Sequence, residues 1–127
     1  MDTTTTQQAT TIVADLANDG GGTYETATLI PFKPEVGFAV GIGGVRYPAS
    51  LFTPGVAAWL LRAVGQEYET SFVGTWLDNE TVCVDAVRYF AGSNRKDALL
   101  AGYQAGQDAI YDFGMSESIY LGEEPIE

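Results

Sequence analysis

The sequence predicts an α+β domain, in which an antiparallel or mixed β-sheet built from hairpins carries two helices packed on one face. Three observations predict this class. Short segments rich in alternating or β-branched residues recur between turn residues. Two other segments carry helix-start signals. The coarse order is three strands, a helix, two strands, a helix and two strands.

At 127 residues the chain has the length of one domain with its own core. We expect a flexible N-terminal segment at 1–22, a single α+β domain at 23–122 and an acidic C-terminal tail at 123–127. The first segment opens with a Thr/Gln run and closes on Gly20-Gly21-Gly22, a composition typical of a flexible joint. Within it, Ile12, Val13 and Leu16 could form one short helical face.

The first strands are predicted from β-formers and from alternation. Residues 23–30 are rich in Thr and Tyr, and prolines follow them. In residues 36–42 the large apolar side chains share one face and the glycines and alanine share the other. Gly43-Gly44 then predicts a two-residue hairpin turn, with the chain returning through residues 45–47.

Two helices are predicted from their ends. Thr53-Pro54 offers a hydroxyl cap followed by proline at the first helical position, and Gly65 is a suitable stop. Ser93 or Asn94 can cap a second helix over residues 95–107.

Two further hairpins complete the expected sheet. Residues 71–77 and 81–89 alternate around the polar turn Asp78-Asn79-Glu80, which is the clearest hairpin in the chain. Residues 109–113 and 117–121 form the last one, around Gly114-Met115-Ser116.

Charge is the most informative number in the composition. Seventeen acids oppose six bases, giving a formal net charge of −11, and the excess of acids lies before Lys33 and after Lys96. Such a field repels nucleic acid and anionic membranes, so we expect neither as a direct partner. It favours a basic protein surface instead, although acidity can also serve solubility alone. The candidate partner-binding residues are Asp97, Asp108, Asp112, Glu117, Glu123 and Glu124.

The remaining composition indicates a cytoplasmic protein. No apolar stretch approaches the roughly 20 residues of a membrane helix. The opening residues 1–6 carry neither a base nor an apolar run, so no secretory signal is expected. The single Cys83 cannot form an internal disulfide, and its position between two valines predicts a buried, inert thiol. A homo-oligomer is compatible with the sequence.

The chain contains no histidine, which excludes the commonest general base and metal ligand. We therefore predict no catalytic residue, no cofactor and no metal site, and a protein that is not an enzyme. Gly41 to Arg46 imitates the start of a dinucleotide fingerprint, but no helix can open at Tyr47-Pro48, so a tight hairpin is the better interpretation. Asp78-Asn79-Glu80 lacks the central glycine of a calcium loop.

Paired carboxylates are the one catalytic route that the residue types leave open. Asp85 is in phase with Cys83 and Val87, and Asp112 stands between two aromatic residues. If both pointed inward, they could share a proton or hold Mg²⁺. Alternatively, Asp85 pairs with Arg46 or Arg88, or faces solvent.

Several segments resemble a family of small uncharacterised proteins found in actinobacterial genomes, plasmids and phages. The resemblance covers about residues 36–121 and is carried by residues 37–41, 73–78, 82–85, 97–100 and 107–112. It implies an origin on a mobile element and brings no established activity. Gly74 to Asp78 and Ala109 to Phe113 are also similar to strands of the ArdA-type antirestriction proteins, which are acidic DNA mimics.

Three functional hypotheses follow. The first is a non-catalytic binding or accessory protein, encoded by a phage or plasmid, that contacts a basic partner. The second is a DNA-mimicking inhibitor of a restriction or CRISPR-type nuclease. The third is a carboxylate-dependent enzyme, which requires Asp85 and Asp112 to lie together in a cleft.

Overall fold

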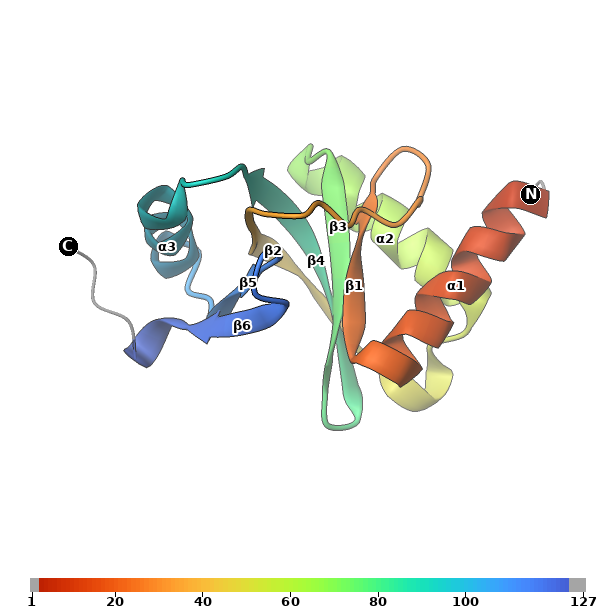
Figure 1. The fold of residues 1–127 in the computed structure, drawn as a ribbon. Helices are drawn as coiled ribbons and strands as arrows, with labels where there is room; N and C mark the ends of the chain where they lie inside the picture. The colour runs from red at the N-terminus through yellow and green to blue at the C-terminus, as the bar shows by residue number, and fades with distance from the viewer. Residues whose placement is uncertain (1–2, 124–127) are drawn as a thin grey trace.

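The structure, a computed structural model, describes residues 3–123 and shows an α+β fold (Figure 1). Within this range the elements are α1 (Thr3–Asp19), β1 (Gly21–Glu25), β2 (Phe38–Pro48), the short 3-10 helix η1 (Ala49–Leu51), α2 (Pro54–Tyr68), β3 (Phe72–Asp78), β4 (Thr81–Phe90), α3 (Arg95–Gln104), β5 (Ala109–Asp112), β6 (Glu117–Tyr120) and a second 3-10 helix, η2 (Leu121–Glu123).

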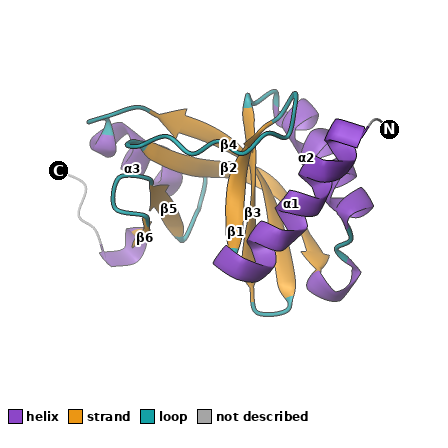
Figure 2. Cartoon of the chain, turned by 45° about the vertical axis from the view of Figure 1, so that its right-hand side comes forward, coloured by secondary structure: helices purple, strands orange, loops and turns teal. Residues whose placement is uncertain are grey.

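The strands form one six-stranded sheet in the order β1-β3-β4-β2-β5-β6, and every neighbouring pair is antiparallel. The predicted α+β class is confirmed, and of the two predicted sheet forms the antiparallel one is correct. The described residues contain three α-helices where the sequence predicts two. Figure 2 shows α1 and α2 together at one end of the sheet and α3 at the other end.

The helices cover the sheet through two groups of buried side chains. The larger group joins Ile12 of α1 and Leu61 of α2 to Val84 of β4, all fully buried. The smaller group joins Leu99 of α3 to Val40 of β2 and Ile110 of β5. Burial of apolar surface in these groups is the main force that holds the helices on the sheet.

The first segment differs from its prediction. Residues 3–19, assigned from the sequence to a flexible stretch, form α1, and Ile12 and Leu16 pack in the larger core group. The Tyr24 hydroxyl donates a hydrogen bond of 2.7 Å to the Asp15 carboxylate, which fastens α1 to β1. Burial of these apolar side chains outweighs the low helix propensity of the Thr run. The expected glycine joint is likewise ordered, because Gly21 and Gly22 pair with β3.

The predicted hairpin at Gly43-Gly44 is wrong. β2 continues through both glycines to Pro48 and pairs with β4 on either side of them. The register shifts between Gly41 and Gly43, so Ile42 is the extra residue of a β-bulge. Gly43 has a φ of +153°. A Cβ on Gly44 would lie 1.8 Å from the carbonyl oxygen of Val84, so only glycine fits there.

The helix signals predict starts better than ends. The Thr53 side chain accepts a hydrogen bond from the Val56 amide, which confirms the predicted cap of α2. The helix passes the expected stop at Gly65 and ends at Tyr68, with Glu69 in the left-handed conformation. Helix α3 starts at Arg95 as predicted, although the Asn94 side chain at the cap position makes no capping hydrogen bond, and the helix ends at Gln104 rather than 107.

Both later hairpins are confirmed. β3 and β4 pair around the turn at Asn79-Glu80, and β5 pairs with β6 around residues 113–116. The acidic tail predicted at 123–127 lies outside the described residues except for Glu123, which ends η2.

Candidate functional site

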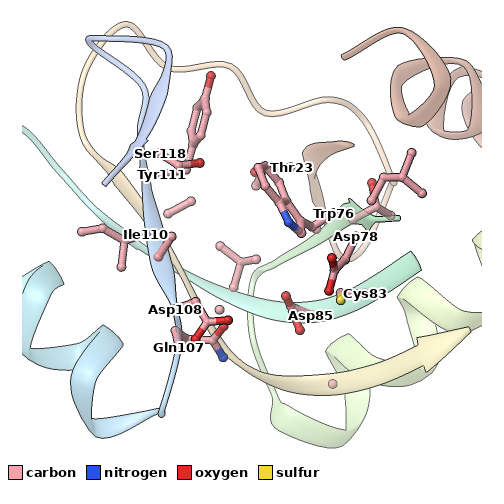
Figure 3. A pocket seen from close by; sticks show the side chains of 18 of the residues that line it. Thr23, Trp76, Asp78, Cys83, Asp85, Gln107, Asp108, Ile110, Tyr111 and Ser118 are labelled. Atoms are coloured by element: carbon pink, nitrogen blue, oxygen red, sulfur yellow. The ribbon is translucent and has the colours of Figure 1, made fainter. Parts of the chain in front are cut away.

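The face of the sheet opposite α2 contains a hollow of about 700 Å³. Figure 3 shows side chains from β3, β4 and the β5–β6 hairpin converging on it, with β2 crossing the lower part of the view. Its charged lining residues are Arg46, Asp78, Asp85 and Asp108. Three carboxylates and one guanidinium therefore give the hollow a negative charge.

The pleat of β4 separates the hollow from the core. Val82, Val84 and Ala86 are fully buried in the helix-covered group. Cys83 and Asp85, which alternate with them, line the hollow. Because successive side chains of a strand point to opposite faces, the hollow lies on the face away from α2.

Asp85 is the most perturbed carboxylate of the hollow. Its side chain is partly buried, and burial raises its pKa to about 6 although the positive charge of Arg46 acts in the opposite direction. Within residues 3–123, its carboxylate has no hydrogen-bond or ion-pair partner. It lies over the backbone of Gly41, where a Cβ would come within 3.2 Å of the carboxylate oxygen. An unpartnered acid in a recess is disposed to accept a ligand charge or proton.

The charge partners predicted for Asp85 are not the observed ones. The Arg46 guanidinium forms an ion pair of 2.9 Å with Asp78, and both side chains are more than half exposed. Arg88 stacks over the ring of Phe90, 5.0 Å from its centroid. The exposed carboxylate of Asp78 therefore takes the ion pair and leaves Asp85 without one.

Cys83 is not buried as predicted. Its side chain is partly exposed in the hollow, in register with Arg46 of β2 and Trp76 of β3. Desolvation raises the pKa of the thiol, and Arg46 lowers it by a smaller amount. The thiol form therefore dominates near neutral pH. The predicted burial is wrong, and the predicted inertness stays a prediction.

The structure does not bring Asp85 and Asp112 together. Asp112 lies at the end of β5, where its carboxylate accepts a hydrogen bond of 3.2 Å from the Met115 amide and caps the last hairpin turn. It does not line the hollow. Residues 3–123 also hold no group of three or more acidic or cysteine side chains arranged to bind a metal ion. The geometry required for the carboxylate enzyme is therefore missing from the described chain.

The predicted partner-binding acids are scattered. Asp108 is exposed and lines the hollow. Asp97 lies in the first turn of α3, and Glu117 begins β6, both exposed and both outside the hollow. Glu123 is the last residue of η2, and Glu124 lies outside the described residues. Among the four whose side chains the structure describes (Asp97, Asp108, Asp112 and Glu117), only Asp108 lines the hollow.

Aromatic side chains provide the apolar part of the site. Trp76 and Tyr120 line the hollow while remaining 45% and 52% exposed. The other end of the same sheet face is closed by a packed aromatic group in which Phe32 stacks on Phe72 at 4.2 Å and meets Tyr89 edge-on. The Tyr89 hydroxyl donates to the Val36 carbonyl and holds the overlying loop in place. The hollow is thus the uncovered half of this face.

The sequence contains one pattern that indicates this site and was not used to predict it. In β4, Cys83 and Asp85 interrupt a run of small apolar residues at every second position, which marks two faces of different polarity. The contributions from β2, β3 and the β5–β6 hairpin have no local signal, because they are brought together only by the sheet order.

Comparison of the chain with protein-family models, with curated proteins and with solved structures finds no match in any of the three. The candidate site accordingly depends on the geometry described above. None of the helices in residues 3–123 is long and apolar enough to cross a membrane.

Proposed function

We propose that this protein is a non-catalytic binding protein that contacts a basic protein partner through the hollow. The observation that carries the proposal is the carboxylate of Asp85, which is half-buried and has no partner within the described chain. A cationic side chain placed beside it would supply the missing charge partner. The exposed carboxylate of Asp108 adds negative charge to the hollow and would attract such a partner from solution.

Exposed aromatic rings support the same proposal. Trp76 and Tyr120 border the hollow. The face of an aromatic ring attracts a Lys or Arg side chain, and its area contributes apolar burial on binding. Trp and Tyr side chains are enriched at the centre of protein interfaces.

The DNA-mimicking inhibitor is the weaker proposal. A mimic presents rows of carboxylates on an outer surface, whereas two of the acids here are engaged elsewhere: Asp112 caps a turn and Asp78 pairs with Arg46. Competition by duplex DNA for an identified partner would favour it. An origin on a mobile element stays a prediction of the sequence resemblance.

The proposal is tested with defined peptides and a fluorescent reporter inside the hollow. Trp59 is 69% exposed on α2, so Trp59→Phe leaves Trp76 as the sole tryptophan without disturbing the core. We expect a Lys/Arg-rich peptide to change the Trp76 emission saturably and to bind more weakly at high salt. An acidic peptide of equal length should have no effect.

A charge-matched pair of variants assigns the binding to the hollow. Asp85→Asn with Asp108→Asn removes two charges inside it, and Asp97→Asn with Glu117→Gln removes two charges outside it. We expect the first pair to weaken binding at least ten-fold and the second pair less than two-fold. Equal losses would show that only the overall negative charge matters, and absence of saturable binding would refute the proposal.

A further inference from the structure

Strand β2 has a free edge that borders the hollow. β4 pairs with it from Phe38 to Pro48, apart from the bulged Ile42. On the other side β5 pairs only with Phe38 and Ala39. No described strand pairs with residues 40–48 on that side. Backbone donors and acceptors along such an edge are a template for another extended chain.

The bulge accounts for this free edge. An extra residue bends a strand and increases its twist, so β2 turns away from β5 after Ala39. Figure 3 shows β2 running across the lower part of the view, away from the β5–β6 hairpin. The edge beyond the bulge is accessible, since Gly44, Val45 and Arg46 are exposed.

The glycines of β2 leave an open path from this edge to Asp85. Gly44 is the register partner of Asp85, and Gly41 lies beneath its carboxylate. Neither carries a side chain. Strands of a sheet lie about 4.8 Å apart, so a residue added opposite Gly44 would stand about 10 Å from Asp85 along the same face. A long side chain on that residue can cross over Gly44 without meeting another side chain.

We propose that the partner binds as an extended segment that adds to the free edge of β2 and places one Lys or Arg side chain over Gly44 against Asp85. This inference rests on the proposed function and adds the mode of recognition. Main-chain hydrogen bonds supply affinity in such an arrangement, and the cationic side chain supplies selectivity. Trp76 of β3, in register with Cys83 of β4, lines the hollow on the side of β4 opposite β2.

The test uses a soluble seven-residue peptide with a central Lys among alternating Thr and Val, and the Trp59→Phe protein as reporter. A strand presents the N–H groups of every second residue to its neighbour. N-methylation of that set of residues removes the hydrogen bonds to β2, whereas N-methylation of the other set leaves them intact. We expect the peptide methylated at one set of alternate residues to bind at least ten-fold more weakly, and the peptide methylated at the other set to bind less than two-fold more weakly. Replacing the central Lys by Gln should weaken binding as much as Asp85→Asn does.

Residue-resolved amide exchange locates the added strand. On peptide binding, alternate amides within residues 43–47 should exchange more slowly. If both methylated peptides bind as tightly as the unmethylated one, strand addition is overturned while the proposed function stays intact. No binding of any basic peptide would overturn both. A chain that dimerises by itself, with the same amides protected, would assign the edge to a second copy and also overturn the inference.

Discussion

The two faces of β4 have different roles, although they belong to one strand. On the helix-covered face Val82, Val84 and Ala86 are fully buried under α2. On the other face Cys83 and Asp85 line the hollow, and Asp85 has a pKa raised to about 6 by burial without a charge partner. One face contributes stability through apolar burial, whereas the other retains a carboxylate that costs stability. Such a costly group is typical of a site that selection keeps for binding.

The largest effect should come from the helix-covered face. Leu61 is fully buried between α2 and the sheet, so Leu61→Ala should lower the free energy of unfolding by about 3 kcal/mol through lost burial and a residual cavity. Urea denaturation at pH 7.5 measures it. Trp59→Ala on the exposed side of the same helix should change stability by less than about 0.5 kcal/mol. Equal losses would mean that α2 is not packed as described.

A smaller effect on the free energy of unfolding should come from the backbone pairing of β2 with β4. In Gly44→Ala the new Cβ would meet the Val84 carbonyl at 1.8 Å, so the backbones must separate. We expect a loss of about 2 kcal/mol in the free energy of unfolding. Gly55→Ala, where nothing lies within 4 Å, should be neutral or stabilise α2 by less than about 1 kcal/mol. An unaffected Gly44 variant would contradict the continuous β2.

A change of opposite sign should come from the open face. The pKa of Asp85 is raised in the folded state from 3.8 to about 6, so its ionisation opposes folding. The contribution of Asp85 to stability should therefore fall as pH rises from about 4 to 6, and Asp85→Asn should remove that loss. At pH 7.5 we expect the variant to be more stable by about 2 kcal/mol, since partial water access reduces the full effect of two pKa units.

Denaturation of both proteins at pH 4 and pH 7.5 gives this difference. At pH 4 the two free energies of unfolding should agree, because the wild-type carboxyl is largely protonated in the folded chain. A variant less stable than wild type at pH 7.5 would show that Asp85 has a stabilising partner.

Local signals in the sequence predicted those parts of the fold that local interactions determine. Thr53-Pro54 starts α2 because cap and proline act within one turn, and the β3–β4 hairpin forms around its polar turn. The possible helical face at Ile12, Val13 and Leu16 is confirmed, but the full length of α1 was not predicted, because its Thr and Gln residues are held in a helix by tertiary burial. Gly43-Gly44 was misinterpreted because a bulge and a two-residue hairpin favour the same residues.

The candidate site was less predictable than the fold. Asp85 was singled out, but the sequence paired it with Asp112. The sheet order places Asp112 away from the hollow, where it caps the last hairpin turn. Asp108 was predicted for its charge alone and does line the hollow. The free edge of β2 could not be foreseen, because it depends on how few residues of β5 pair with it, which is a property of tertiary geometry.

The two-residue pairing between β2 and β5 also bears on how the molecule fluctuates. The unit formed by α3, β5 and β6 is joined to the main sheet by two ladder positions, by Phe113 of the last hairpin, and by a small apolar group around Val40 and Leu99. The Phe113 amide donates to the Gly37 carbonyl, and its ring contacts Phe32 and Tyr89 edge-on. The β3–β4–β2 ladders, in contrast, extend over seven or more residues each. We therefore expect the C-terminal unit to open before the main sheet, so that its amides exchange as a group at a lower free energy than those of β4.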